Sequence, residues 1–180
     1  MDLMILLKSL YFILPAYFAN MAPVAFKNVN FLATPVDFGK KLGKNPVFGA
    51  HKTWRGMVAA TLAGILIFYI QKILYQYIFF AKISLIDYSS YSIFLGALIG
   101  FGAIFGDLVK SFFKRRLSIK PGKRWIPFDQ LDFVIGALAF ASFYYIAPLT
   151  VWIILIIVTI PLHMAANHIA FYLGISKQKW

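Results

Sequence analysis

The sequence predicts an all-α integral membrane protein with five transmembrane helices, its amino terminus outside and its carboxyl terminus in the cytoplasm. Three observations predict this class. Of the 180 residues, 61% are apolar, and the mean hydropathy is +0.77. Long apolar runs separate short charged blocks, and most of the basic residues lie in segments that five crossings would place on one side. Because soluble domains are close to half apolar, the excess indicates a lipid environment. We expect one membrane domain over residues 1–180.

The first three spans follow from apolar runs of the length that crosses a bilayer. A helix of about 20 apolar residues covers the roughly 30 Å of hydrocarbon. Residues 3–25, 54–80 and 93–113 each supply such a run. No cleavable signal peptide is expected, because the first run continues through Pro15 and Tyr17 without a basic leader.

A long charge-free segment supplies the last two spans. Residues 133–176 contain no Asp, Glu, Lys or Arg. As a single helix they would extend about 66 Å, which is about twice the thickness of a bilayer. Proline interrupts the hydrogen-bond ladder of a helix, so we expect the chain to fold back at Pro148. The predicted spans are then 129–147 and 149–173.

The third span carries glycines at a helix-packing spacing. Gly96-x-x-x-Gly100 and Gly102-x-x-x-Gly106 lie within one apolar run. Small residues let helix backbones approach each other closely. We therefore expect these glycines to serve packing between helices.

The orientation follows from the basic residues. Segments 26–55 and 110–124, together with Lys177 and Lys179, hold 15 of the 18 Lys and Arg residues, and five crossings put all of them on one side. Basic loops stay in the cytoplasm, so this side is cytoplasmic and carries two polar loops. We expect a multi-pass protein of the cell membrane whose active site faces the cytoplasm.

The net charge of +12 does not indicate a nucleic-acid partner. The charges lie in short blocks between apolar runs, whereas nucleic-acid binders spread them over a polar surface. The expected partner is the bilayer itself. With no cysteine, the chain has no thiolate metal site. No feature of the sequence indicates an oligomeric state.

All six acidic residues are aspartates, and three of them are expected to converge. Asp107, Ser111 and Lys114 follow one another at i, i+4 and i+7 at the cytoplasmic end of the third span. Asp129 and Asp132 lie on the first turn of the fourth span. Consecutive spans joined by one inner loop place these acids at similar depth. Hard oxygen ligands of this kind suit Mg²⁺, which binds one or two carboxylates plus substrate phosphates.

Structural alternatives exist for each acid. Asp107 would also fit a local ion-pair patch with the lysines beside it, although ionisable groups within a membrane are functional candidates by default. One of Asp129 and Asp132 would also fit a helix-capping role after Pro127, but two acids on one side of the same turn are harder to explain in this way.

The loop between the two acid clusters is rich in positive charge. Lys110, Lys114 and Arg115 lie beside the acids, where they would clamp phosphates. Lys120, Lys123 and Arg124 lie further along the loop and would equally suit binding of anionic lipid headgroups. Carboxylates, a metal ion and fixed cations around one pocket are what phosphoryl or nucleotidyl transfer requires.

The first inner loop supplies further candidates, within TPVDFGKKLGKNPVFGAHKTWRG at 34–56. Lys52-Thr53 resembles the end of a P-loop, but the Gly-x-x-x-x-Gly that should precede it is missing. Glycines in the loop would still let backbone N–H groups approach phosphates. Asp37 is a candidate partner for a base amino group. Arg55 and Trp54 fit interface anchors.

The histidines do not form a spaced metal motif. His163 and Asn167 lie at i and i+4 on the last span, near its cytoplasmic end, where hydrogen bonding between helices and a site role are both open. Asn20, late in the first span, is a similar candidate.

Once assembled, these residues resemble those of a known family. The order Gly106-Asp107-Leu108, Ser111, Lys114-Arg115, Pro127 and Asp129-x-x-Asp132 resembles the signature of membrane CTP-dependent phosphatidate cytidylyltransferases. Lys110 stands where that signature has an acid, and its His-Gly-Gly stretch is absent. These departures and the small size point to the archaeal branch, the CDP-archaeol synthases. Further segments share this resemblance: LPAYFANMAP at 14–23, residues 34–56, GDLVKSFFKRR at 106–116, PFDQLDFVIGA at 127–137, and PLHMAANHIAFYLGISKQKW at 161–180.

The resemblance implies a reaction and a set of roles. CTP and 2,3-di-O-geranylgeranylglyceryl phosphate, an isoprenoid glycerol ether-lipid phosphate, would give unsaturated CDP-archaeol and pyrophosphate with Mg²⁺, as a step in membrane phospholipid biosynthesis. Asp107 and Asp132 would bind the metal, with Asp129 assisting. The expected roles of the others are phosphate neutralisation by Lys114, Lys110 and Arg115, a hydrogen bond from Ser111, and substrate binding by Lys52, Thr53, Arg55, Asp37 and Asn20.

Three alternative functions would require other sequence features. A CDP-alcohol phosphotransferase needs an Asp-Gly-x-x-Ala-Arg helix, which is missing. An anion or nucleotide transporter with a basic cytoplasmic vestibule would bind phosphate without reacting, and would tolerate loss of Asp107 better than loss of Lys114. A lipid-binding scaffold leaves the three converging acids unexplained.

Overall fold

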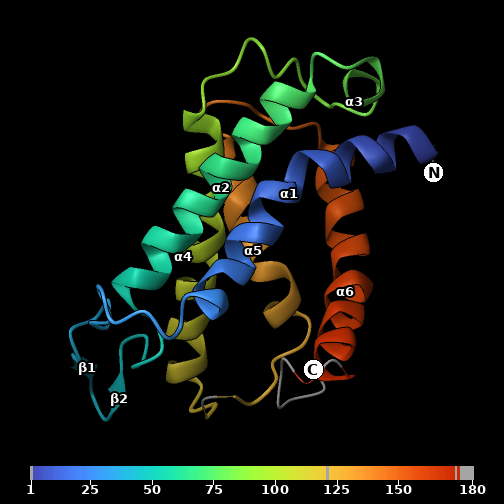
Figure 1. Ribbon diagram of the computed structural model, residues 1–180. Coiled ribbons are helices and arrows are strands. Elements are labelled where there is room, and N and C mark those ends of the chain that lie inside the picture. Colours follow the sequence, from blue (N-terminus) through green and yellow to red (C-terminus); the bar gives the residue numbers. More distant parts are fainter. Residues whose placement is uncertain (1, 121, 173, 175–180) are drawn as a thin grey trace.

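Long helices form a bundle in the computed structural model, which describes residues 2–120, 122–172 and 174 (Figure 1). The helices are α1 (Leu3–Ala25), α2 (Trp54–Leu74), α3 (Ile78–Lys82), α4 (Phe94–Arg116), α5 (Phe128–Ala141) and α6 (Leu149–Tyr172). The strands β1 (Lys41–Leu42) and β2 (Asn45–Pro46) form an antiparallel hairpin. This hairpin, within the first inner loop, is a small departure from the predicted all-α fold.

Four helices in the described part of the chain are long and apolar enough to cross a membrane, namely α1, α2, α4 and α6. The chain is therefore a multi-pass membrane protein. Helix α5 has 14 residues, which is about 21 Å at 1.5 Å per residue and shorter than the hydrocarbon core. The predicted span 129–147 is thus wrong as a helix beyond Ala141, because residues 142–148 form a turn and an irregular connection.

The predicted end of the second span also needs correction. The second span was expected to run to residue 80, but α2 ends at Leu74 and a separate short helix follows. Lys72, in the last turn of α2, donates hydrogen bonds to the backbone carbonyls of Tyr88, Ser89 and Tyr91, and so holds the following connection against the helix end. The sequence did not predict this turn, because residues 75–80 are mostly apolar and continue the apolar run.

The third predicted span, 93–113, continues as α4 through three basic residues to Arg116. The side chains of Lys114 and Arg116 reach polar partners at the helix end, so these charges do not end the helix. The start of α6 at Leu149 confirms the predicted break at Pro148. Residue 173, the end of the last predicted span, lies outside the described residues, as do Lys177 and Lys179.

Glycines bring α4 close to both of its neighbours, as their spacing predicts. A Cβ built on Gly64 of α2 would lie 2.6 Å from the Gly100 Cα of α4. A Cβ built on Gly102 of α4 would lie 3.0 Å from the Ala137 Cα of α5. Side chains at these positions would force the helices apart, so the prediction of a packing role is confirmed. The contact between α4 and α5 also determines how close their acids lie.

The two loops predicted to be cytoplasmic, here called the inner loops, meet at one end of the bundle, which we call the basic end (residues 26–53, 117–120 and 122–127; Figure 1). Arg116, the last residue of α4, donates hydrogen bonds to the carbonyls of Leu42, Asn45 and Pro46 in the hairpin. Asn45 donates in return to the Arg115 carbonyl at 2.9 Å. The hairpin is therefore attached to the end of α4 and covers that side of the bundle.

Helix α6 packs on the bundle mainly through its first half. Val151 and Leu155 are fully buried, and Thr159 shares a 2.8 Å hydrogen bond with Tyr17 of α1. Beyond Pro161 the side chains are mostly partly or fully exposed, and the helix descends to the basic end beside the start of α5 (Figure 1). At that end, residues of α1, α5 and α6 line a common cavity.

Candidate active site

The centre of the site is the ammonium group of Lys110. This group lies 2.9 Å from Asp107 Oδ1, 2.7 Å from Asp132 Oδ2 and 3.4 Å from Asp129 Oδ1. Lys110 and Asp107 share one face of α4, and the other two acids come from the first turns of α5. The predicted convergence of three acids from two neighbouring helices is therefore present in the structure, with a lysine among them.

Lys52 joins this cluster from the first inner loop. Its ammonium contacts the second oxygen of Asp107, Oδ2, as an ion pair and a hydrogen bond. Lys52 directly precedes Thr53, the N-cap residue of α2. The start of α2 thus places a loop lysine against an acid on α4, and the first inner loop closes one side of the site.

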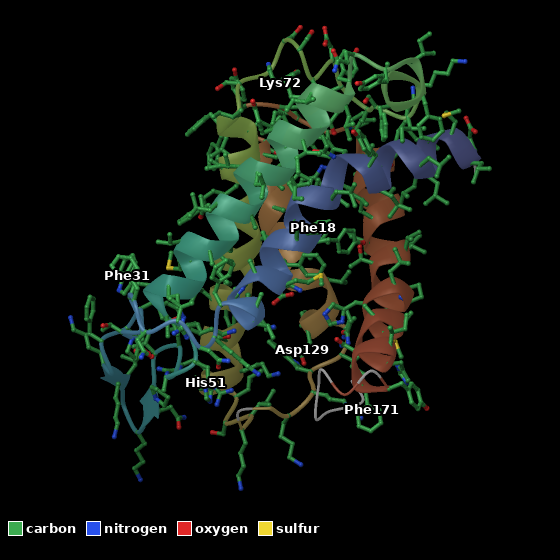
Figure 2. The ribbon with its side chains drawn as sticks, viewed as in Figure 1. Phe18, Phe31, His51, Lys72, Asp129 and Phe171 are labelled. Carbon is green, nitrogen blue, oxygen red and sulfur yellow. The ribbon has the colours of Figure 1, made fainter. Side chains whose placement is uncertain are left out.

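Lys114 and Asp129 close the other side. The Lys114 ammonium lies 2.9 and 3.1 Å from the two oxygens of Asp129 and donates to the Lys123 carbonyl at 2.5 Å. Asp129 Oδ2 also accepts the Trp125 backbone N–H at 2.6 Å. This set of contacts folds the 117–127 loop back onto α4 and α5 (Figure 2).

Three carboxylates and three ammonium groups therefore alternate in a largely enclosed cluster. The side-chain exposure is 12% for Asp107, 15% for Lys110 and 5% for Asp132. Taking such charges out of water is costly unless each one is paired. Each acid here has at least one lysine partner, which lets the charges persist at this depth.

A divalent metal ion fits Asp107 and Asp132. Both carboxylates point at one position, because each lies within 2.9 Å of the same nitrogen. Among the described residues, the enclosed Asp132 Oδ2 contacts the Lys110 ammonium as an ion pair and has no other hydrogen-bond partner, so its surroundings suit a cation at this position. No three His, Cys, Asp or Glu side chains of residues 2–120, 122–172 and 174 surround a common metal position. Two carboxylates completed by water and phosphate oxygens are nevertheless a typical Mg²⁺ environment.

A polar cavity of about 250 Å³ opens beside the cluster, between the ends of α1 and α4, the 117–127 loop, and α5 and α6. Its lining combines four cations with one acid and several amide or imidazole groups: Lys110, Lys114, Lys123, Arg124, Asp129, Gln130, Asn20, His163 and Asn167, with Gly122. An excess of positive charge beside buried acids suits an anionic ligand such as a phosphate group.

The structure brings most of the predicted site residues together. Asp107, Asp129, Asp132, Lys52 and Lys110 form the cluster described above, with Lys114 at its edge. Ser111 is buried one turn after Asp107. Asn20 lies on the cavity wall.

Three other predicted residues make local structural contacts. The Thr53 hydroxyl accepts the Gly56 N–H at 3.2 Å and caps α2. The Arg55 guanidinium donates to the Val29 carbonyl, away from the acids. The Arg115 carbonyl is the acceptor for the hairpin. None of these three contacts involves the acid cluster.

Asp37 organises the first inner loop. Its carboxylate accepts the backbone N–H groups of Gly39 at 3.0 Å, Phe48 at 2.9 Å and Gly49 at 3.0 Å. Burial acts to raise the pKa of the Asp37 carboxyl, but the donors from Gly49, Phe48 and Gly39 outweigh it and hold the pKa below its usual value. Both oxygens are thus engaged by the loop backbone in this structure.

Reasoning from the sequence missed the parts of the site that depend on tertiary contacts. In the sequence, Arg116 is only one basic residue of segment 110–124, whereas in the structure it donates hydrogen bonds to three hairpin carbonyls and lies over the Phe112 ring at 5.1 Å. Gln130 was not singled out, although it lines the cavity. Its position one residue after Asp129 was the available signal. The sequence left two roles open for His163 and Asn167, namely hydrogen bonding between helices and a part in the site. Both residues line the cavity and share a 3.2 Å hydrogen bond within α6, which favours a part in the site.

The chain is similar to known proteins over almost its whole length. The family model for CarS-like CDP-archaeol synthases matches residues 2–180. The CDP-archaeol synthase of Methanocaldococcus jannaschii is 40% identical over 179 residues, covering 98% of each chain. That of Pyrococcus furiosus is 39% identical over 177 residues, covering 97% of this chain and 95% of the relative.

A solved structure has the same fold. It is described as an intramembrane enzyme for archaeal membrane lipid biosynthesis, and its TM-score with this chain is 0.72 at 31% sequence identity. The match covers 90% of this chain and 94% of that one. This full-length agreement of sequence and fold, added to the charged cluster at the end of a membrane bundle, shows that the chain belongs to the CDP-archaeol synthase family and is a membrane-embedded nucleotidyltransferase.

Proposed function

We propose that this protein transfers CMP from CTP to an isoprenoid glycerol ether-lipid phosphate, 2,3-di-O-geranylgeranylglyceryl phosphate, and releases pyrophosphate and unsaturated CDP-archaeol. The observation that carries the proposal is the alternation of Asp107, Asp129 and Asp132 with three lysines beside a basic cavity. Membership of the family supports the choice of substrates.

In this reaction an oxygen of the lipid phosphate attacks the α-phosphorus of CTP. A new P–O bond forms, and the bond between the α-phosphorus and the bridging oxygen to the β-phosphate breaks. The lipid phosphate is already anionic near neutral pH, so no strong general base is required. The protein has to align the two phosphates and neutralise their charge.

Asp107 and Asp132 are the residues that would hold Mg²⁺, with Asp129 assisting directly or through water. The bound ion would supply Lewis-acid polarisation of the phosphates and neutralise the charge that builds up on pyrophosphate. The protein would hold these carboxylates in place where α4 contacts α5, next to the lysines that would bind phosphate.

Lysines and a serine would hold the phosphates. Lys110 and Lys114 line the cavity and would pair with phosphate oxygens, and Lys52 would close over the nucleotide from the first inner loop. Ser111 would donate a hydrogen bond. Arg115 would add positive charge at the rim. Each of these groups acts by position and charge, with no covalent intermediate on the protein.

The lipid would approach the cavity from the side of α6. His163 and Asn167 form the wall there, and apolar side chains are exposed nearby on α1 and α6: Phe18 is 47% exposed, Met21 64% and Leu162 42%. Prenyl chains would lie against this apolar surface between the helices, so that the phosphate head reaches Lys110 and Lys114. Asn20, on α1, would contact the same head group.

The site would face the cytoplasm of the cell. Helix α5 and the connection 142–148 would together make a fifth crossing, which puts the amino terminus outside. The basic residues at 26–55 and 110–124 support this orientation.

The test is a reaction with purified components. The protein in detergent or liposomes, given CTP labelled in its α-phosphate, the lipid phosphate and Mg²⁺, should form labelled CDP-lipid. Pyrophosphate should appear in equal amount. A transporter with the same basic vestibule would move or bind CTP and leave it intact, so binding without CDP-lipid would overturn the proposed reaction.

A further inference from the structure

The Lys110 ammonium occupies the point at which the site's two metal-binding acids converge. It lies within 2.9 Å of an oxygen of Asp107 and of Asp132, and Asp129 Oδ1 is 3.4 Å away. The side chain is 15% exposed, so water screens these contacts little. This position is also where a cation shared by Asp107 and Asp132 would lie.

An ammonium group and a dication cannot occupy this point together. At a separation of a few ångströms their repulsion is large in a medium of low dielectric constant. A divalent ion therefore has to displace Lys110 from the acids before it can bind both of them. Displacement alone would leave Lys110 with only Asp129, which Lys114 already pairs, and an enclosed charge that is poorly paired is costly.

The cavity offers Lys110 a second position. The same side chain lines the basic cavity beside the cluster. A lysine carries its charge on a flexible stem of four carbons, so a turn about its side-chain bonds moves the ammonium by several ångströms. A phosphate in the cavity would then replace the carboxylates as the partner of the ammonium group.

We propose that Lys110 is a built-in counter-ion that exchanges with the divalent cation. Without nucleotide, Lys110 neutralises Asp107 and Asp132 and keeps divalent ions out. When a nucleoside triphosphate brings phosphate into the cavity, Lys110 moves to that phosphate and the metal takes its place. The inference rests on the proposed function, since it assigns the metal to these two acids, and it adds an order of binding: the metal binds tightly only with the nucleotide.

The experiment measures binding of Mn²⁺, a spectroscopic substitute for Mg²⁺, to the purified protein without lipid, by electron paramagnetic resonance of the free ion. It is done first without nucleotide and then with CTP, after subtraction of the Mn²⁺ that CTP binds by itself. The variant Lys110→Met keeps the bulk of the side chain and removes its charge. It should bind Mn²⁺ about tenfold or more tightly than the unaltered chain. The matched control is Lys120→Met, which removes an exposed charge from the same end of the bundle and should leave the Mn²⁺ affinity unchanged.

Further variants test whether the gain in Mn²⁺ affinity arises at this site. Lys110→Gln retains an N–H donor for the acids and should show the same gain, which protects the test if the methionine variant folds poorly. Adding Asp132→Asn to either Lys110 variant should abolish the gain, because one of the two proposed ligands is then lost. Size-exclusion chromatography and thermal unfolding check that each variant is folded.

Each outcome has a distinct meaning. If the unaltered protein binds Mn²⁺ through Asp107 and Asp132 only with CTP, and the Lys110 variants bind it alone, the exchange is supported. If the Lys110 variants are folded and show no gain while the unaltered protein with CTP still binds Mn²⁺ there, the exchange is wrong and the metal site stands. If no form binds Mn²⁺ through these acids, with or without CTP, the metal assignment of the proposed function is itself overturned.

Discussion

Gly106 of α4 and Gly136 of α5 lie in direct backbone contact: a Cβ built on Gly136 would lie 2.9 Å from the Gly106 Cα. Gly106 directly precedes Asp107, and its own Cβ would overlap the Asp132 carbonyl. The two helices are thus in close backbone contact beside the acids, and the distance between Asp107 and Asp132 depends on the absence of side chains at these two positions.

Replacing Gly106 with alanine should therefore damage both stability and activity. The added methyl group meets backbone atoms, which cannot move aside, so we expect a loss of about 1–3 kcal/mol in the free energy of unfolding. The thermal midpoint in detergent and the CDP-lipid turnover measure the two effects. Gly56→Ala in α2 is the matched control, because its Cβ would lie at 3.4 Å or more from its neighbours. Equal effects of the two substitutions would contradict this account of the helix contact.

Neutralising either proposed metal ligand should remove most turnover. Asp107→Asn and Asp132→Asn keep the shape of each side chain but lose the negative charge, so we expect turnover to fall by about a hundredfold or more, a loss in the range seen when a key electrostatic group is removed. The labelled-CTP reaction measures this. Asp87→Asn, at a fully exposed position at the opposite end of the bundle, should leave turnover unchanged. Retained activity in the folded Asp107→Asn protein would reject the site assignment.

Lys114 and Asp129 should act as a coupled pair. The Lys114 ammonium lies 2.9 and 3.1 Å from the two oxygens of Asp129, so removing either residue takes from the other its closest partner of opposite charge. Lys114→Ala and Asp129→Ala should each lower turnover about tenfold or more, and the double variant should lose less than the product of the two losses. Kinetics of the four forms with CTP give the coupling, and strictly multiplicative losses would show that the pair does not act as a unit.

The stability of the first inner loop should depend on pH through Asp37. A native pKa below the usual value means that the unfolded chain binds more protons as the pH falls. The contribution of Asp37 to stability is therefore complete above its ordinary pKa of 3.8 and is lost as the pH falls through the lower native value.

The comparison of unaltered protein with Asp37→Asn tests this. Their difference in thermal midpoint should be constant between pH 5 and 7 and should shrink below about pH 4. Faster tryptic cleavage after Lys40, Lys41 and Lys44 in the variant at pH 8 would report the same loosening of the loop. A difference that grew on acidification would contradict the assigned direction of the pKa.

The orientation can be tested with single cysteines, because the chain has none of its own. Ser90 and Lys41 are exposed at opposite ends of the bundle. In right-side-out vesicles, a membrane-impermeant maleimide should label Ser90→Cys and leave Lys41→Cys unlabelled until the membrane is permeabilised. The reverse pattern would place the basic end outside the cell.

Several features of this protein are determined by the sequence alone. Apolar runs and the fold-back at Pro148 predict the long helices, since a bilayer imposes a minimum length on any span and proline breaks a helix. Segregation of basic residues predicts which loops lie together. The spacing of Asp107, Ser111 and Lys114 predicts a shared helix face, and that of Asp129 and Asp132 predicts a common turn, because helix geometry is local.

Other features of the site and the fold depend on contacts between residues distant in sequence, so only the tertiary structure decided them. The glycine contact between α4 and α5 sets the separation of the acids, and the turn after Leu74 depends on Lys72 binding carbonyls across the connection. Lys110 was expected to contact phosphate. In the structure its ammonium instead lies between Asp107 and Asp132. Helical spacing does not determine this position, because it depends on the electrostatics of side chains in an enclosed site.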